Sequence, residues 1–361
     1  MADVSSWLGK IRGHVKEAQS RFREDARQRE AAGRLPKDQN IILTEREVRG
    51  DWDASRVLMT TLNGEARPIT ANDLAAFRQN MRAARRAMGN REGITARQVI
   101  DLASSRSLKY AHPDGPFESD IDKARKEITY SMPVSAINGQ IRFLTNAGPN
   151  SKVTRHNVTV NLLEWNAAAA QLASTDKKKS PEQIARWLRK QRLAFDCDCE
   201  RHRYFFRYVA SIGGFAAGRK ETGYPKIRNP GLRGVACKHV LRVMSDLESS
   251  GRVLSFLTRL LERTSEYRAK YSITQKEAEK LLREKKRPTA IKTTEQRRAE
   301  ASRRRAAAAA KKAVSQPPKA SPKGQKTPVE RRAQQGEKAL RELMKKFNLT
   351  PEQIMTMLQK D

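Results

Sequence analysis

All three cysteines of the 361-residue chain fall within one stretch, and two of its five histidines lie beside them. Cys197 and Cys199 are separated by one residue, and 37 residues later Cys237 and His239 repeat that spacing. Thiolate sulfur and imidazole nitrogen are ligands that zinc prefers, usually four of them in a tetrahedron. We therefore predict that Cys197, Cys199, Cys237 and His239 bind one Zn²⁺ ion.

The two ligand pairs need different backbone conformations to face one ion. In an extended strand, residues i and i+2 point to the same side, so Cys197 and Cys199 can both reach the metal. In a regular α-helix, residues two apart are separated by about 200°. Cys237 must therefore lie in a loop or at the helix start, with His239 in the first turn. The predicted unit is a strand, a loop and a helix that close around the zinc.

His202 competes with His239 for the fourth position, because it follows Cys199 by only three residues. We favour His239, since it alone brings the distant Cys237 and its helix to the ion. Buried cysteines also occur as small apolar side chains, and that alternative needs no metal. Four protein ligands leave no open position for water, so the predicted zinc is structural and not catalytic.

The pattern C-x-C, a loop, and C-x-H ahead of a helix resembles the SWIM-type zinc finger. All four ligand positions match, and the resemblance covers about residues 125–250, which includes the strands that usually precede the cysteines. The loop is longer than most members of the family carry. The family is linked to DNA or protein binding and not to catalysis, so the resemblance implies a binding module.

The loop between the ligand pairs combines aromatic residues, glycines and basic side chains. Its first part, 204–212, is apolar and is expected in the core. In its second part, Tyr224 lies among basic residues that suit contact with a phosphate backbone, namely Arg219, Lys220, Lys226, Arg228 and Arg233. An ordinary solvated loop would carry the same residues. The segment from IGGFAAGRKETGYPKIRNP to GVACKHVLRVM also resembles segments of virion proteins of tailed bacteriophages.

The chain is strongly basic, with a formal net charge of +33. Such an excess resists compaction unless a polyanion neutralises it, and nucleic acid is the usual partner because phosphate contacts release counterions. We expect DNA, bound without sequence specificity; a scaffold for acidic proteins is the alternative. No segment approaches the roughly 18 uncharged apolar residues that a membrane helix needs. These features predict a reducing location. We expect the virion and the host cytoplasm, with the nucleus as the alternative.

The pattern of apolar residues predicts an α+β fold, in which a small antiparallel sheet carries the zinc-pinned module and basic helices flank it. Strands are expected at about 127–135, 140–145 and 153–163, with Asn138-Gly139 as a hairpin turn. Helix starts are expected near three capping positions, at Thr70 or Asn72, at Thr95 and at Ser180. Arginines at 78, 82, 85 and 86 make the first of these helices basic, either as a phosphate-facing surface or as a solvated face.

The α+β core is expected to cover 38–250, and the flanking segments differ in composition. A basic amphipathic helix is expected over 1–36 and polar helices over 252–287. A C-terminal helical hairpin is expected over 336–361. Residues 283–335 hold 17 Lys or Arg against 4 Glu, a net charge of +13. Few large apolar residues occur there, so we expect 288–335 to be a disordered basic linker. Its phosphate contacts are expected from Arg303, Arg304, Arg305, Lys311 and Lys312.

These observations predict a non-enzymatic, zinc-stabilised nucleic-acid-binding protein, such as a phage virion component. The acidic residues are scattered, and no nucleotide-binding G-x-x-x-x-G-K-[ST] motif, Ser-His-Asp triad or Cys-His dyad is recognisable. One alternative is an assembly protein whose terminal helices bind partner subunits. Another is a nuclear SWIM-type regulator with REKKRPTAIK as its import signal.

Overall fold

The computed structural model describes residues 41–352, apart from 90–91, 108–109, 113–114, 150, 175–178, 265–268, 285–287, 316–327 and 348–349. The helix expected over 1–36 lies outside the described residues. The chain divides after Arg298 into two units. The first unit holds the sheets and the cysteines, and we describe the two units separately.

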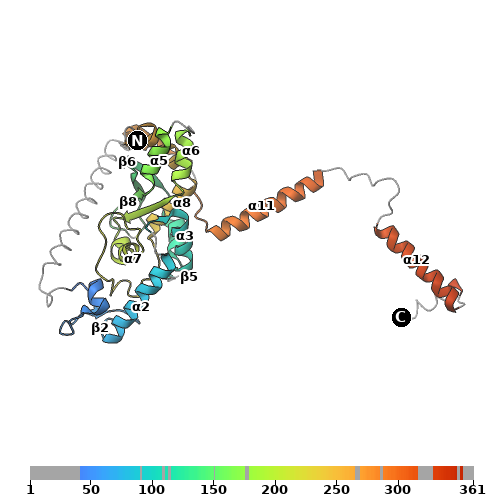
Figure 1. Ribbon diagram of the computed structural model, residues 1–361, viewed down its shortest axis with the longest axis horizontal. Helices are drawn as coiled ribbons and strands as arrows, with labels where there is room; N and C mark the ends of the chain where they lie inside the picture. The colour runs from blue at the N-terminus through green and yellow to red at the C-terminus, as the bar shows by residue number, and fades with distance from the viewer. Residues whose placement is uncertain are drawn as a thin grey trace. The chain divides into compact units, whose positions relative to one another are not determined.

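The first unit is built around a six-stranded antiparallel sheet, larger than the three or four strands expected (Figure 1). Its central hairpin turns at Asn138 and Gly139, whose φ angles of 47° and 78° suit a tight two-residue turn. A Cβ on Gly139 would come within 2.6 Å of Trp165 Cβ, so this position requires glycine. In order across the sheet, the strands are β10 (Lys270–Ser272), β6 (Ser131–Ile137), β7 (Gln140–Asn146), β8 (Arg155–Leu162), β9 (Arg192–Cys197) and β3 (Ile94–Thr95).

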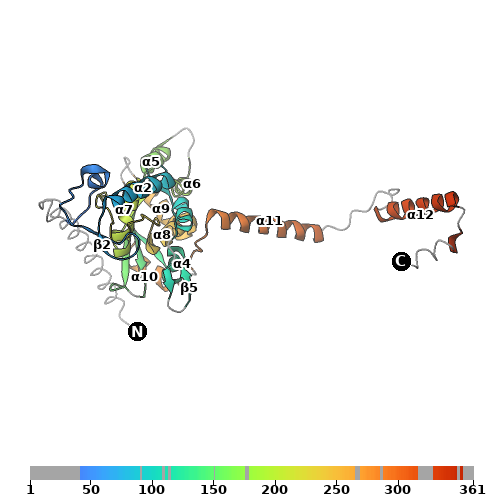
Figure 2. The ribbon, with the colours of Figure 1, turned by 90° about the horizontal axis from the view of Figure 1, so that it is seen from below.

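Helices cover the sheet, and α8 (Lys238–Ser249) contacts β6, β7, β8 and β9 (Figure 2). Capping boxes open three helices at the predicted residues Thr70, Thr95 and Ser180. A fourth capping box, at Ser119, opens a helix that ends at Glu127, which explains why β6 starts later than residue 127. The other helices of this layer are α3 (Ala96–Ser105), α4 (Asp120–Glu127), α5 (Trp165–Ala173), α6 (Pro181–Leu188) and α9 (Gly251–Glu262).

A second apolar cluster forms a lobe beside the main core. We call this the α2 lobe; it joins α2 (Ala71–Met88), the short helix η1 (Glu47–Asp51) and α7 (Arg207–Ile212). The hairpin of β1 (Met59–Thr60) and β2 (Arg67–Pro68) completes it. Its apolar centre consists of Leu43, Val48, Leu58, Leu74, Phe77, Met81, Ala84, Tyr208, Val209, Tyr224 and Leu232.

The core continues past residue 250, where the sequence predicted polar helices over 252–287. Helix α9 buries five apolar side chains, and β10 pairs with β6 at the edge of the sheet. Ile291, 1% exposed, also belongs to the main core. The polar composition of 252–287 hid this arrangement, because α9 concentrates its apolar residues on one helical face while α10 (Gln275–Arg283) buries none.

The disorder predicted for 288–335 is wrong for two segments, which are helical. Helix α11 spans Thr294–Ser315 and α12 spans Pro328–Phe347, eight residues earlier than the hairpin predicted from 336. Alanine, arginine and lysine are good helix formers, and Arg304 pairs with Glu300 one turn away at 2.8 Å, so burial is not required. Most of the second helix of the predicted hairpin lies outside the described residues. Among the described helices, none is long and apolar enough to cross a membrane.

Arg242 is the largest fully buried side chain of the described residues, and it connects three segments. Its Nε donates to Ile128 O at 2.8 Å and its Nη2 donates to Ala124 O at 3.0 Å, at the end of α4. Nη1 donates to Thr289 O, just before α11. One guanidinium therefore satisfies three backbone carbonyls, two of them through fully buried hydrogen bonds.

Replacing Arg242 with methionine should lower the free energy of unfolding by about 2–4 kcal/mol, because three carbonyls lose their donor inside the core. Urea denaturation followed by circular dichroism measures this loss. Arg186→Met is the matched control, since Arg186 is exposed and pairs only with Glu182 on the same helix. That control should change stability by no more than about 0.5 kcal/mol. Equal losses in the two variants would contradict the assigned role of Arg242.

Candidate metal centre

The structure brings the four predicted ligands together. The ligand atoms of Cys197, Cys199, Cys237 and His239 all lie within 4.8 Å of one another, and all four residues are buried. The Nδ1 atom of His239 faces the sulfurs, at 4.0 Å from Cys197 Sγ. In a tetrahedral zinc site with Zn–S bonds near 2.3 Å, sulfur atoms lie about 3.8 Å apart. The cluster is therefore compact enough to hold one metal ion.

Backbone structure places each ligand as the spacing predicted. Cys197 is the last residue of β9 and pairs with Val158 of β8, and Cys199 follows directly. Cys237 is the N-cap residue of α8, with extended backbone angles, and His239 lies in the first turn of that helix. The last residue of β9 and the bend that follows the strand therefore supply two ligands, so Cys199 lies just past the extended strand in which both cysteines were predicted. The helix start supplies the other two.

His202 is not part of the cluster, although it was the competing ligand. Its buried imidazole Nε2 lies 3.1 Å from Asp196 Oδ1, and Asp196 also accepts a hydrogen bond from Arg207 at 2.7 Å. The backbone N–H of His202 donates to Cys199 Sγ at 3.3 Å. His202 thus supports the thiolate of Cys199 through its backbone, while its side chain pairs with a carboxylate.

A histidine and an aspartate that the sequence analysis missed surround the cluster. Asp198 lies between the first two cysteines, and its Oδ1 is 2.8 Å from Nδ1 of His156. The ring of His156 lies against the ring of His239, with centroids 4.4 Å apart. Ser151 Oγ is 3.4 Å from the other nitrogen of His156, which completes a Ser–His–Asp chain that was not recognisable in the sequence. The Cys-Asp-Cys sequence was the one local signal, since it fixes Asp198 beside the ligands.

Burial controls the protonation of the ligands. It raises the pKa of Cys197 and of Cys199, because a buried thiolate loses its hydration. Burial also opposes ionisation of Cys237, but hydrogen bonds from Cys197, Cys199 and His239 outweigh it and lower the pKa of that thiol. Burial lowers the pKa of His239, which favours the neutral imidazole. A neutral imidazole and thiolates are the forms that bind a metal.

Two charged side chains border the cluster. Burial, and then the charge of Cys237, raise the pKa of Asp120 to about 7. Arg201 Nε lies 3.9 Å from Asp120 Oδ1, and its guanidinium lies 3.7 Å from the centre of the Phe205 ring. Burial lowers the pKa of Arg201 to about 10. A cationic side chain therefore stays near Cys237 at neutral pH.

The basic residues predicted to contact nucleic acid are partly accessible. In the loop, Lys226 is half-buried and its pKa is lowered by burial and by Arg56. Tyr224, which lies among these basic residues in the sequence, is buried: it donates to Pro230 O at 2.6 Å and belongs to the apolar cluster of the α2 lobe. Lys312 lies in α11. The predicted residues that are exposed are Arg219, Lys220, Arg228, Arg233, Arg303, Arg304, Arg305 and Lys311.

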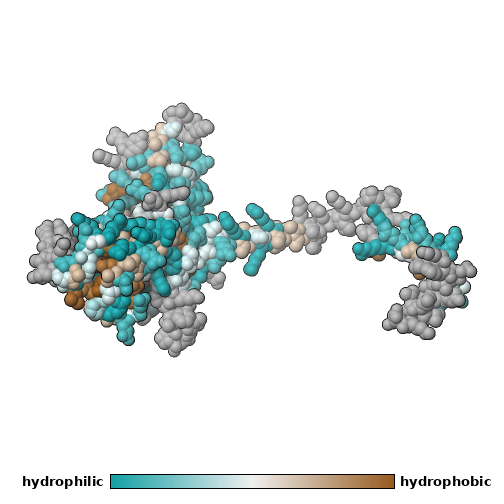
Figure 3. Space-filling view, turned by 60° about the horizontal axis from the view of Figure 1, so that its bottom comes forward, coloured by the Kyte–Doolittle hydropathy of each residue, from teal (hydrophilic) through white to brown (hydrophobic). Residues whose placement is uncertain are grey.

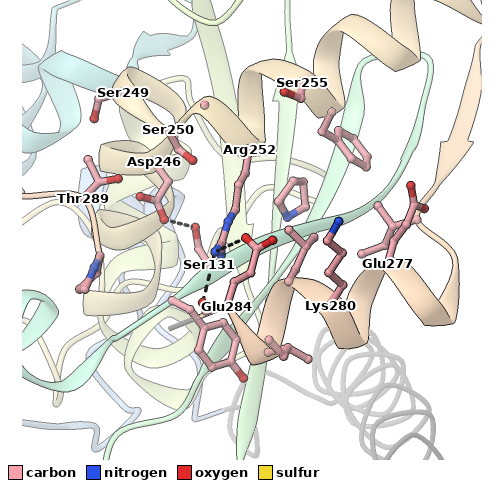
Figure 4. A pocket seen from close by; sticks show the side chains of 18 of the residues that line it. Ser131, Asp246, Ser249, Ser250, Arg252, Ser255, Glu277, Lys280, Glu284 and Thr289 are labelled. Carbon is pink, nitrogen blue, oxygen red and sulfur yellow. Dashed lines mark hydrogen bonds and ion pairs between the residues drawn. The ribbon is translucent and has the colours of Figure 1, made fainter. Parts of the chain in front are cut away.

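A separate cavity of about 880 Å³ lies between β6, the α8–α9 junction and α10 (Figure 4). The sequence analysis did not predict it. Ser131 Oγ donates to Asp246 at 2.6 Å in its wall. Arg252 pairs with Glu284 at 3.3 Å across the same space. These acidic and basic groups satisfy one another, so the cavity wall carries little charge for a ligand to neutralise.

The fold and the site define an α+β protein with a buried cluster of three cysteines and one histidine that could hold one metal ion. Comparison of the chain with protein-family models, with curated proteins and with solved structures found no match. The SWIM-type resemblance therefore stays an expectation that rests on the spacing of the four ligands.

Cys237→Ser should abolish metal binding, because it removes one of four ligands and the N-cap residue of α8. His202→Ala should keep one zinc equivalent per chain, since its side chain pairs with Asp196 and not with the cluster. Inductively coupled plasma mass spectrometry of the purified variants measures the metal content. Loss of zinc from His202→Ala, with far-UV circular dichroism unchanged, would contradict this ligand set.

Zinc affinity should rise with pH. Burial raises the pKa of Cys197 and of Cys199, so zinc must displace protons from these thiols, and acid competes with the metal. Calorimetric titration of the apoprotein in buffers of different ionisation enthalpy counts the released protons. Binding that releases none and is equally tight at pH 6 and pH 8 would refute the assigned protonation states.

Proposed function

We propose that the protein binds nucleic acid without catalysis, and that one structural zinc ion holds its binding module in shape. The exposed basic side chains of α11 carry this proposal, because they have few carboxylates to neutralise them. DNA is the proposed nucleic acid, and the resemblance to virion proteins of tailed phages supports packaged DNA as its source.

Zinc is the metal that suits the cluster best. Three sulfurs and one imidazole nitrogen form a soft ligand set, and a closed tetrahedral site of this kind is typical of structural zinc. The four ligand residues are at most 3% exposed, which supports a closed, structural site. The proposed role of the ion is therefore to hold β9, the start of α8 and both ends of the intervening loop in place.

Helix α11 offers phosphate contacts along a solvated face. Arg303, Arg304 and Arg305 are consecutive and exposed, and Lys311 follows them two turns later. Only Arg304 of these four has an ion pair among the described residues, with Glu300. In Figure 3 the first part of the helix is hydrophilic and the alanine run after it is mildly apolar. Contacts of this kind bind phosphates and carry no sequence information.

The start of α11 is attached to the first unit by hydrogen bonds. The basic residues of α11 come next along the chain. Thr294 donates to Asp101 of α3 through its backbone N–H at 2.7 Å, and its hydroxyl donates to the same carboxylate. Arg125 of α4 donates to Ile291 O at 2.8 Å. The exposed residues Arg219 and Arg228 of the loop add further positive charge within the first unit.

Helix α12 favours a second candidate function, the assembly of partner subunits. Leu340 is 42% exposed and Val329 is 76% exposed, although both are apolar. An amphipathic helix with an uncovered apolar face binds partner surfaces in many complexes. This function would operate beside nucleic-acid binding, because α12 and the basic residues of α11 are separate segments of the chain.

The variant R303Q/R304Q/R305Q should bind duplex DNA less tightly and with a weaker salt dependence. If each arginine neutralises one phosphate, the slope of log K against log salt concentration should become shallower by about 2.7. Fluorescence anisotropy of the full chain from 50 to 300 mM salt measures this. The control R46Q/K126Q/R186Q removes the same three charges from residues that pair with carboxylates, and it should leave the slope nearly unchanged. Wild-type affinity that is independent of salt would rule out the proposed function.

A further inference from the structure

A small cavity in the α2 lobe is lined almost entirely by arginines. It has a volume of about 240 Å³, and its wall consists of Arg49, Arg78, Met81, Arg82 and Arg85. Pockets for drug-sized molecules usually measure about 300–1,000 Å³, so this one suits a single charged group. Arginine is the side chain that best matches the oxygens of phosphate, because its planar guanidinium donates two parallel hydrogen bonds.

Two elements of the α2 lobe build the cavity. Arg78, Arg82 and Arg85 follow one another at intervals of four and three residues, which places them on one face of α2. Arg49 comes from η1. Nη1 of Arg78 donates to Val48 O at 2.9 Å and so fixes η1 against α2. The sequence showed that α2 is basic, but the fourth arginine is brought to the site only by the fold.

The positive charge of the cavity is only partly neutralised. Glu45 accepts a hydrogen bond from Arg85 Nη2 at 2.6 Å and another from Arg49 Nε at 3.0 Å. Burial opposes its ionisation, but these two arginines outweigh burial and lower the pKa of Glu45. One carboxylate therefore serves two of the four guanidinium groups. Arg82 is exposed and has no ion pair or hydrogen bond among the described residues.

The loop between the metal ligands lies beside this cavity. The backbone N–H of Glu45 donates to Thr222 O at 3.2 Å, and Thr44 forms an isolated antiparallel β-bridge with Gly223. The exposed residues Arg219 and Lys220 precede these contacts by only a few residues. The loop, α2 and η1 thus present basic side chains within the same lobe.

We propose that Arg49, Arg78, Arg82 and Arg85 form a phosphate-binding site, and that a backbone phosphate of a nucleic acid occupies it. The choice of nucleic acid rests on the proposed function, whereas the phosphate site itself rests on the cavity. The phosphate offsets the repulsion among the four guanidinium groups and gives Arg82 the acceptor that it lacks. The α2 lobe is then a second binding surface, separate in sequence from α11.

Arg82→Gln tests the site, because among the described residues Arg82 has no ion pair or hydrogen bond to lose, so the variant should fold normally. Duplex DNA should bind about tenfold more weakly, with the salt slope shallower by about 0.9. Arg86→Gln is the matched control: Arg86 is an exposed arginine of α2 that does not line the cavity. Arg86→Gln should leave the affinity for DNA and the salt slope unchanged. Arg82→Lys should keep the salt slope but lose part of the affinity for DNA.

Calorimetric titration with inorganic phosphate separates the two parts of the proposal. Both parts are supported if the wild type binds phosphate, Arg82→Gln binds phosphate at least fivefold more weakly, and the DNA result above is obtained. Phosphate binding lost in Arg82→Gln while DNA binding is unchanged overturns the nucleic-acid assignment. Equal DNA and phosphate binding by Arg82→Gln and Arg86→Gln overturns the site. Failure of the wild type to bind DNA defeats the proposed function instead, and the phosphate titration then still tests the cavity.

Discussion

The meeting of three sulfurs and one imidazole nitrogen in a dry interior is the constraint on which the rest of the structure depends. Buried thiolates are costly unless a cation or strong hydrogen bonds compensate for the lost hydration. Cys197 and Cys199 come from the end of β9, and Cys237 and His239 come from the start of α8. The cluster therefore fixes the helix against the strand at the one place where their ends meet.

The same cluster sets the geometry of the α2 lobe. Between Cys199 and Cys237 the chain contributes to both apolar clusters: Phe206, Ala210 and Phe215 lie in the main core, whereas Tyr208, Val209 and Tyr224 lie in the lobe. Backbone bonds join this loop to residues near Thr44 and Thr61, so the lobe and the metal centre constrain each other. Zinc contributes about 10–16 kcal/mol to the folding of small zinc modules. Here the ligands lie within a large apolar core, so a bound metal would reinforce that core at the junction of β9 and α8.

The sequence predicted those features that depend on near neighbours in the chain. The i, i+2 logic placed the four ligands, Asn138-Gly139 placed the hairpin, and capping residues placed three helix starts. Features that depend on distant partners were missed. β3 and β10 are only two and three residues long and form because long strands offer them an edge. His156 reaches Asp198 across 42 residues, and no local pattern encodes that contact.

The prediction of disorder near the C-terminus failed for a different reason. It relied on the lack of apolar residues, which does exclude a packed core, but α11 needs no core because its alanines and arginines favour helix intrinsically. The distribution of charge also became clear only in three dimensions. Many basic residues of the first unit pair with carboxylates, as Arg46 does with Asp51 and Arg192 does with Glu164. The consecutive arginines of α11 mostly do not.

The attachment of the chain just before α11 has a mechanical consequence. Arg242 holds Thr289 O with one nitrogen and the end of α4 with the others, and it belongs to the same helix as His239. Tension on a polymer gripped by α11 would therefore be transmitted along this guanidinium to α8, within one turn of a metal ligand. A load on α11 would therefore reach the helix whose first turn carries His239.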